Sequence, residues 1–120
     1  MPRLFVYAHL LRTAPLHHLL DGARLLGHHR TTTSFTLLET TCGVGLSPEG
    51  TTPIDGEVYS LTYSHLNALD EALINTHPLH RAELVTPYGE AWYYALDPVP
   101  MDAVALPHGD WLAWRARQRR

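Results

Sequence analysis

The chain has 120 residues, of which 45% are hydrophobic and 18% charged, and its formal net charge is -3. These values are typical of one globular domain with its own core, and they exclude extensive disorder and a nucleic-acid-binding surface spread over the whole molecule. No apolar run approaches the roughly 20 residues that cross a bilayer, and residues 1–11 lack the pattern of a secretory signal. The single cysteine, Cys42, excludes an internal disulfide and fits a reducing compartment. We therefore expect a cytoplasmic protein.

An apolar run opens the chain and a helix-like segment follows it. Residues 4–7, LFVY, are continuous and apolar, which predicts a strand buried on both faces. Residues 12–22 predict a helix, because Thr13 is a candidate N-cap, Pro15 suits a first turn and Gly22 ends the apolar pattern.

The next part of the chain combines strand-forming residues with glycine and proline. Residues 23–27 and 30–38 predict strands, the second of them rich in threonine. Residues 42–56 hold four glycines and two prolines, so we expect a long loop beside whatever pocket exists. Residues 56–62 return to strand character.

The second half of the chain gives the clearest signals. A helix is predicted behind Ser64, its candidate N-cap, because Leu66, Leu69 and Leu73 fall on one face. Residues 80–96 predict a hairpin, since two strand-like runs flank a Pro-Tyr-Gly turn. The segment that follows has no firm period.

Strands interrupted by two helices predict an α+β fold. We expect a small, partly open β-barrel of about six strands with two principal flanking helices, because closing a small sheet is a natural way to bury its apolar face. One domain should cover residues 1–114. Residues 115–120 hold four of the nine arginines and predict a basic, frayed and solvated tail.

Several segments together resemble one family. LFVYAHL resembles the Y-G-S-L strand-to-loop motif of the γ-glutamylcyclotransferase-like (AIG2-like) superfamily, and DGEVYSLT, LNALDEAL and HRAELVTPYGEAWYYAL follow in that family's order. TPYGEAW and HGDWL resemble its small bacterial YtfP-like branch. The resemblance covers residues 3–114 and implies a small barrel with a cavity at one end.

The resemblance also implies a chemistry. In active members the loop of the Y-G-S-L motif holds the γ-glutamyl group, and its backbone amides bind the carboxylate. A glutamate in the motif L-D-x-x-E accepts a proton from the α-amine, which attacks the γ-carbonyl and gives 5-oxoproline. No metal and no cofactor are implied, because the nucleophile is intramolecular.

This chain departs from the family at the general base. Reading L-D-x-x-E onto Leu69 and Asp70 places Leu73 at the glutamate position. A leucine cannot accept a proton, and loss of a general base typically lowers a rate about 10²- to 10⁴-fold. Glu71 is two residues away along the helix, so it points in nearly the opposite direction and is expected to be a solvated charge.

A second departure lies in the loop. Ala8 stands where the family has glycine, and His9 where it has serine or threonine. Glycine permits a positive φ that a methyl group disfavours, so Ala8 should narrow or reshape the anion site. His9 is either a replacement base or anchor for a carboxylate, or a histidine hydrogen-bonded to backbone at the end of a strand.

Other residues complete the expected ligand site. Arg81 matches the arginine of the family's Y-x-R strand motif, and it either holds an acidic ligand or pairs with a carboxylate at the barrel rim. Aromatic residues of the hairpin either pack in the core or line the cavity. The residues that we expect to bind the ligand are Tyr7, Ala8, His9, Leu10, Arg81 and Tyr93.

Two other enzyme classes lack support. The adjacent histidines at 17–18 and 28–29 diverge in any regular element, and His77 and His80 have no cysteine nearby, so we expect no metal. Cys42 has no motif around it and is expected to be a small buried residue rather than a nucleophile.

Three functions therefore stay open. The first is a small-molecule-binding protein on the cyclotransferase scaffold, with the pocket kept and the proton transfer lost. The second is an active γ-glutamylamine cyclotransferase with His9 as the replacement base. The third is a structural or partner-binding role that uses the loop and the arginine tail. We expect a small-molecule ligand, no nucleic acid or membrane partner, and a monomer or homodimer.

Overall fold

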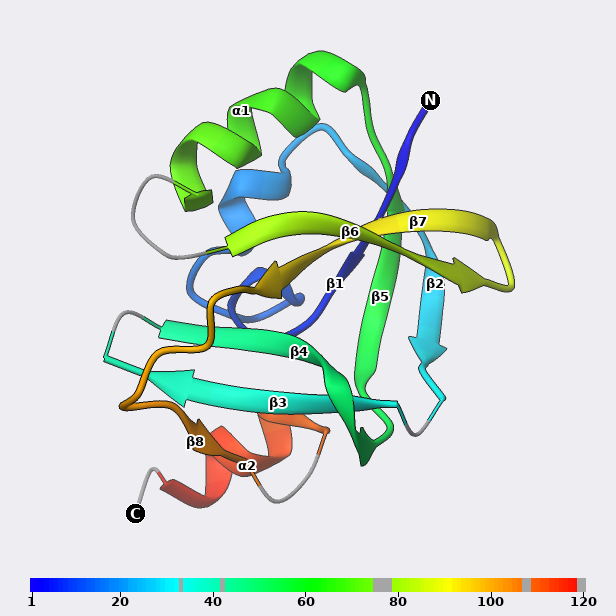
Figure 1. Ribbon diagram of the computed structural model, residues 1–120. Coiled ribbons are helices and arrows are strands. Elements are labelled where there is room, and N and C mark those ends of the chain that lie inside the picture. Colours follow the sequence, from blue (N-terminus) through cyan, green and yellow to red (C-terminus); the bar gives the residue numbers. More distant parts are fainter. Residues whose placement is uncertain (33, 42, 75–78, 107–108, 119–120) are drawn as a thin grey trace.

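The predicted first strand is the centre of the fold. In the computed structural model, which describes residues 1–32, 34–41, 43–74, 79–106 and 109–118, this strand is β1 (Arg3–Val6), with Leu4 and Phe5 fully buried. Strands and helices follow in an α+β arrangement (Figure 1). The further elements are the 3₁₀ helices η1 (Ala8–Leu10) and η2 (His17–Leu20), the strands β2 (Arg24–Arg30), β3 (Phe35–Thr40), β4 (Gly43–Thr52), β5 (Asp55–Ser60), β6 (Leu79–Thr86), β7 (Gly89–Leu96) and β8 (Val104–Ala105), and the helices α1 (Tyr63–Ile74) and α2 (Trp111–Gln118).

The strands form one mixed sheet that branches at β7. The order is β2-β5-β1-β7-β4-β3-β8, and β6 pairs with β7 along its other edge. On the shared edge, β1 pairs in parallel with β7 at Leu4 and Trp92, whereas β4 pairs in parallel with it at Leu46 and Ala95. Strand β7 thus pairs with both β1 and β4, which diverge from each other, and this divergence opens the sheet at the end of β1.

The core fills the inside of this curved sheet and the space below α1. Leu66, Leu69 and Leu73 are the buried residues of α1, as the spacing of the leucines predicts. Phe35 on β3 and Tyr93 on β7 meet edge to face, with ring centroids 5.6 Å apart, which joins the two halves of the sheet. The largest fully buried side chains are Phe5, Leu4, Leu37, Leu46, Ile54, Leu61, Leu66, Leu69, Val6 and Val58.

Two predicted segments have a different structure. The predicted helix over residues 12–22 is wrong. The segment consists of turns and η2, and it folds back on the loop that follows β1 (residues 7–11, the first loop). Thr13, the expected cap, has a φ of 70°. The predicted loop over residues 42–56 is also wrong, because most of it is β4. Gly45 serves close packing there, since a Cβ at this position would lie 2.8 Å from the Cβ of Leu96.

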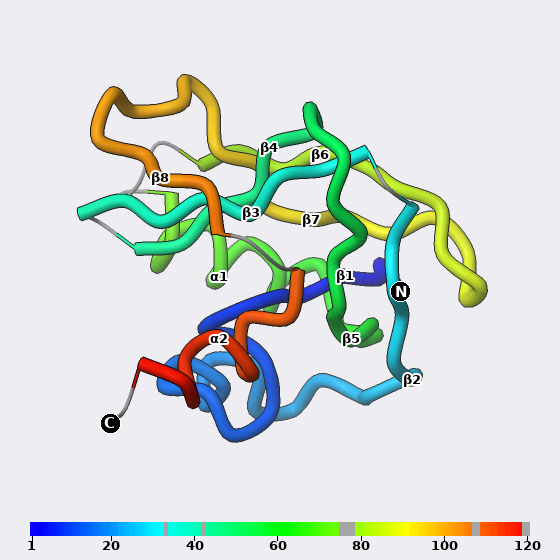
Figure 2. The backbone as a smooth tube through the Cα atoms, turned by 90° about the horizontal axis from the view of Figure 1, so that it is seen from below, coloured from blue at the N-terminus to red at the C-terminus, as the bar shows by residue number. Residues whose placement is uncertain are grey.

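The second principal helix is at the C-terminal end of the described chain. There are eight strands among the described residues rather than about six, because β4 and β8 add to those predicted. The helix α2 continues to Gln118, so residues 115–118 are helical and not the frayed tail that the arginines predict. Figure 2 shows α2 on the side of the sheet where the first loop lies.

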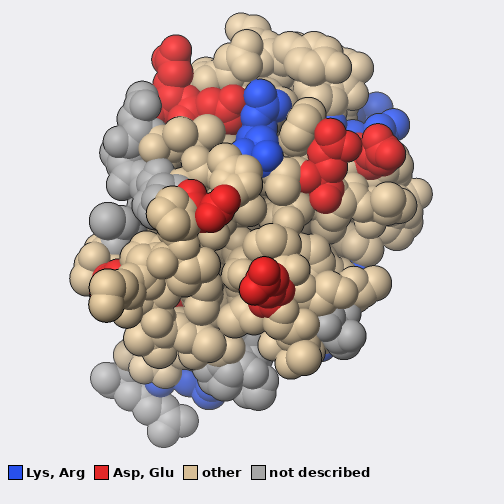
Figure 3. All heavy atoms as spheres, in the orientation of Figure 1, with Lys and Arg blue, Asp and Glu red and all other residues tan. Residues whose placement is uncertain are grey.

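Surface charge is dispersed on the face that Figure 3 shows, where acidic and basic side chains stand singly or in small groups among uncharged ones. Among the described residues, no helix is both long and apolar enough to cross a membrane.

Candidate functional site

A cavity of about 620 Å³ opens where β1 and β4 diverge. This volume is within the range of small-molecule sites, and the walls are mostly apolar and aromatic. Four parts of the chain form the walls: the end of β1 with the first loop, the β3–β4 turn, the end of α1 with the facing hairpin, and α2. The lining residues are Phe5, Val6, Tyr7, Ala8, His9, Leu10, Pro15, Leu16, Glu39, Thr40, Thr41, Gly43, Val44, Leu73, Leu79, Tyr94, Trp111, Trp114 and Arg115.

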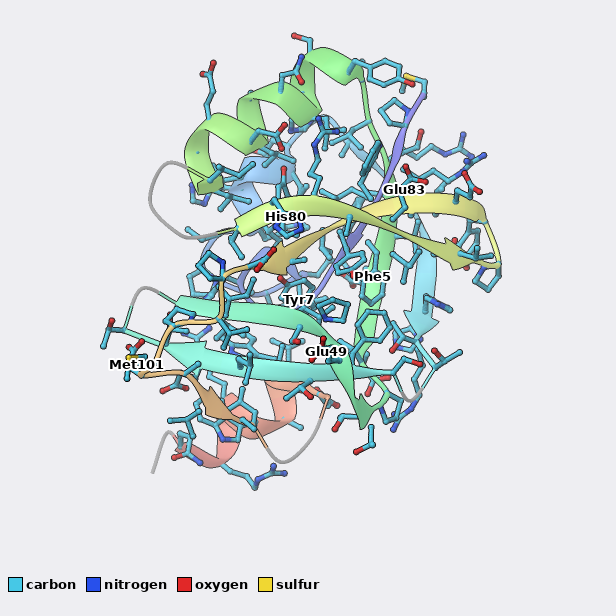
Figure 4. The ribbon with its side chains drawn as sticks, viewed as in Figure 1. Phe5, Tyr7, Glu49, His80, Glu83 and Met101 are labelled. Carbon is cyan, nitrogen blue, oxygen red and sulfur yellow. The ribbon has the colours of Figure 1, made fainter. Side chains whose placement is uncertain are left out.

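Tyr7 lies where β1 and β4 separate. Its hydroxyl donates a hydrogen bond to the carbonyl oxygen of Tyr94 on β7. Burial raises the pKa of Tyr7, and a hydrogen bond from the backbone of Leu46 on β4 lowers it. In Figure 4 the side chain of Tyr7 lies inside the fold between β7 and β4. This tyrosine therefore links β1 to β7 across the opening.

The backbone of the first loop has, at Ala8, a conformation that favours glycine. Ala8 is buried and has a φ of 57°, a conformation that costs an L-residue about 1–2 kcal/mol. Ala8 thus holds a positive φ in place of a glycine, and it forms part of the cavity wall.

The carbonyls of the loop are engaged within the loop itself. The carbonyl oxygen of Ala8 accepts from the N–H of Leu11, and that of His9 accepts from the N–H of Leu16. Nδ1 of His17 lies 3.0 Å from the carbonyl oxygen of Leu10, and since a carbonyl only accepts, this ring nitrogen carries the proton. A loop whose carbonyl oxygens are bound in this way repels an anion less than one whose oxygens face the cavity.

A buried carboxylate fixes the loop to the sheet. Glu57 on β5 is 8% exposed and accepts hydrogen bonds from the backbone N–H of Arg12 at 3.0 Å, from Nε of Arg12 at 2.7 Å and from the hydroxyl of Tyr59 at 3.1 Å. Burial and the neighbouring Glu57 raise the pKa of Tyr59, so its hydroxyl stays a donor. The loop is thus held at Arg12, between the lining residues 7–10 and the lining residues Pro15 and Leu16.

The opposite wall is α2, which is anchored at its start. Gly109 lies so close to β5 that a Cβ there would be 1.8 Å from the carbonyl oxygen of Pro53, and its own carbonyl accepts from the N–H of Asp55. The carboxylate of Asp110 then caps the helix by accepting from the N–H of Ala113 at 3.0 Å. These contacts place the first turn of α2 against the cavity.

Trp111 is the central side chain of this wall. Its ring lies 4.6 Å from the ring of His9 in an edge arrangement, and the guanidinium of Arg115 lies 5.2 Å from its ring centroid. The indole is 3% exposed, and its N–H has no hydrogen-bond acceptor within the described part of the chain. Trp111 therefore connects the first loop to the only arginine of the described lining.

Comparisons with known proteins identify the family of the chain. Residues 4–113 match the family model described as "Gamma-glutamyl cyclotransferase, AIG2-like". The chain belongs to this family. A curated relative, the "Gamma-glutamylcyclotransferase family protein YtfP" of Escherichia coli K12, is 32% identical over 111 residues, which are 92% of this chain and 96% of the relative.

Solved structures show the same fold. An uncharacterised protein from Pyrococcus horikoshii superposes with a TM-score of 0.85 at 24% identity, over 98% of this chain and 96% of that one. The solution structure of YtfP from Escherichia coli superposes with a TM-score of 0.75 at 29% identity, over 94% of this chain and 98% of that one. The expected family and fold are therefore confirmed.

Leu73, which the resemblance to the motif L-D-x-x-E places at the glutamate position, lies in the cavity wall. Leu73 is 7% exposed and lines the cavity together with the first loop. Asp70, one turn earlier, accepts from the hydroxyl of Tyr94 at 2.8 Å and pairs with Nε of Arg81 at 3.1 Å. Glu71 is exposed. Neither carboxylate of α1 is in the described lining.

Two expected ligand residues lie outside the described lining of the cavity. Arg81 pairs with Asp70 and stands over the ring of Trp92 at 4.8 Å, so the structure favours the rim ion pair over a ligand contact. Tyr93 packs against Phe35 in the core, and its neighbour in sequence, Tyr94, lines the cavity instead. Successive residues of a strand face opposite sides, so the prediction named the residue next to the one that lines the cavity.

Sequence reasoning missed the walls that come from β3 and α2. Glu39, Trp111 and Arg115 reach the cavity from elements remote in sequence from the first loop. The one available signal was the spacing of Trp111, Trp114 and Arg115, which puts them on one face of a helix. Among the described residues, no group of three His, Cys, Asp or Glu side chains could hold a metal ion. Cys42 and His77 lie outside the described residues.

Proposed function

We propose that this member of the γ-glutamylcyclotransferase family binds a γ-glutamyl compound or a similar acidic metabolite in the cavity, without the family's general-base glutamate. The observation that carries the proposal is the position of Leu73, which lines the same cavity as Tyr7, Ala8, His9 and Leu10. A binding site of suitable size is retained, while the side chain at the catalytic position is a hydrocarbon.

Helix α1 offers no direct substitute for the missing acid. Asp70 is held by Tyr94 and Arg81, and moving it into the cavity would break a hydrogen bond and an ion pair together. Glu71 faces solvent. Without a proton acceptor, the α-amine of a bound γ-glutamyl compound stays mainly protonated and is a poor nucleophile.

The test is calorimetry with γ-L-glutamyl-n-butylamide, combined with an assay for 5-oxoproline. We expect saturable binding and no release of 5-oxoproline from the wild type. Leu73→Glu restores the family residue, and Leu73→Gln is its matched control, since the amide is similar in size but is not a base. Absence of binding to the wild type would contradict the proposal.

A second candidate is an active γ-glutamylamine cyclotransferase in which His9 replaces the base. It is favoured by the position of His9 in the cavity lining, in ring contact with Trp111. The two candidates differ in one measurement. Turnover by the wild type that disappears in His9→Ala, with binding retained, selects the enzyme, whereas binding without turnover selects the binding protein.

A further inference from the structure

The end of α1 gives the cavity a wall without negative charge. Leu73 and Leu79 are 7% and 8% exposed, and both line the cavity with hydrocarbon side chains. Asp70, one turn before Leu73, is outside the described lining, and Nε of Arg81 at 3.1 Å neutralises its charge. The hydroxyl of Tyr94, which also lines the cavity, donates to Asp70 at 2.8 Å, and burial raises its pKa, so it stays un-ionised.

The remaining acceptors of the described lining do not replace a carboxylate at this wall. The carbonyl oxygens of Ala8, His9 and Leu10 already have hydrogen-bond partners within residues 11–17. Glu39 on β3 is the one acidic side chain of the described lining, and it is exposed. An exposed carboxylate is hydrated and screened by salt, so it attracts an ammonium group only weakly.

Groups that suit an anion gather where α2 meets the first loop. The ring of Trp111 lies 4.6 Å from the ring of His9, and the guanidinium of Arg115 lies 5.2 Å from the centroid of the Trp111 ring. Within the part of the chain that the structure describes, the buried indole N–H of Trp111 has no acceptor and Arg115 has no carboxylate partner. Unused donors and a positive charge favour a carboxylate at the first loop.

The two charged groups of a γ-glutamyl ligand are therefore received differently. Its carboxylate has donors at the first loop, whereas the resemblance to the motif L-D-x-x-E places its α-ammonium beside Leu73. A charge that leaves water without a counter-charge loses its hydration and gains nothing in return. The ammonium group should therefore weaken binding rather than strengthen it.

We propose that the cavity selects an acid without an α-ammonium group, such as a monoamide of glutaric acid, over the γ-glutamyl compound of the same shape. This inference rests on the proposed function and deepens it, because it names the class of acidic metabolite that the cavity binds best. The carboxylate lies where the first loop meets Trp111 and Arg115, and the unsubstituted α-carbon lies against Leu73.

The test compares three ligands that differ only at the α-carbon, with dissociation constants measured by calorimetry. γ-L-glutamyl-n-butylamide carries an ammonium group there, the 2-hydroxyglutaric analogue carries a hydroxyl group, and glutaric acid mono-n-butylamide carries only hydrogen. The wild type should bind the glutaric compound about tenfold more tightly than the γ-glutamyl compound. The hydroxyl analogue should bind nearly as tightly as the glutaric compound, because a hydroxyl is similar in size to the ammonium group but has no charge.

Variants of position 73 test the cause of this preference. Leu73→Glu should reverse the preference about tenfold, because its carboxylate pairs with the ammonium group. Leu73→Gln adds no charge and should keep the wild-type order. Leu25→Glu makes the same change at an exposed leucine on β2, outside the described lining, and should also keep it. If Leu73→Glu does not fold, the three ligands on the wild type decide the question by themselves.

The outcomes separate this inference from the proposed function. Equal or tighter binding of the γ-glutamyl compound by the wild type overturns the inference while the proposed function stands. A hydroxyl analogue as weak as the γ-glutamyl compound also overturns it, since size and not charge would then be the cause. Loss of affinity in Glu39→Gln for the γ-glutamyl compound alone overturns it as well, because the ammonium group would then have a partner. A wild type that binds none of the three ligands overturns both.

Discussion

Removing one oxygen atom from Tyr7 should destabilise the protein more than the size of the change suggests. In Tyr7→Phe, the carbonyl oxygen of Tyr94 loses the hydrogen bond that it accepts from the hydroxyl. A buried polar group left without a partner costs about 1–3 kcal/mol. Tyr7 also lines the cavity, where water can reach part of the gap, so we take the middle of this range and expect the free energy of unfolding to fall by about 2 kcal/mol.

The assay is urea unfolding at equilibrium, with Tyr63→Phe as the matched control. Tyr63 is 68% exposed, so its loss of a hydroxyl should change the free energy of unfolding by less than about 0.5 kcal/mol. A Tyr7→Phe variant as stable as Tyr63→Phe would show that the two strands are held together at the cavity without the tyrosine, and the reasoning would fail.

Three further predictions concern the parts that frame the cavity. Glu57→Gln should lower the free energy of unfolding by about 2 kcal/mol in urea titrations, because the carboxylate accepts charge-assisted hydrogen bonds, whereas Glu49→Gln should have little effect. Gly109→Ala should lower the free energy of unfolding by about 3 kcal/mol or more, because the added methyl group would meet backbone atoms of Pro53 and Ile54. Equal stability of the variant and the wild type would contradict the close approach of Gly109 to these atoms. Burial raises the pKa of four of the six tyrosines above 10.0. Their contribution to stability is therefore present below pH 10.0 and is lost as pH rises toward the higher pKa of the folded state. The part of the tyrosinate absorbance that these four contribute should rise together with unfolding, and gradual ionisation of all six tyrosines in the folded protein would contradict this. The four are Tyr7, Tyr59, Tyr93 and Tyr94.

The parts of the fold with a strong local pattern could be predicted from the sequence. The run at residues 4–7 and the hairpin at 80–96 match β1, β6 and β7, because burial and turn chemistry decide both locally. Residues 43–52 could not be recognised, since glycine signals a turn, whereas Gly45 here allows contact with Leu96 from a distant strand. That requirement depends on tertiary packing and is invisible in a short window.

Only part of the candidate site could be predicted from the sequence. The motif at residues 4–10 predicts a loop after the first strand, and Ala8 in this loop has a positive φ. Glu39, Trp111 and Arg115 line one cavity only because β7 holds β1 and β4 apart and Gly109 brings α2 against β5. No local pattern encodes that meeting, so the part of the site that carries charge was outside the reach of sequence reasoning.

The position of the indole rings has a practical consequence for any study of occupancy. Two of the three tryptophans, Trp111 and Trp114, line the cavity, and the third, Trp92, lies beneath Arg81 away from the described lining. Intrinsic fluorescence of the unlabelled chain should therefore be weighted toward the cavity, so that a bound solute or an entering quencher changes the emission directly. The protein carries its own optical reporter, and Trp92→Phe would isolate it.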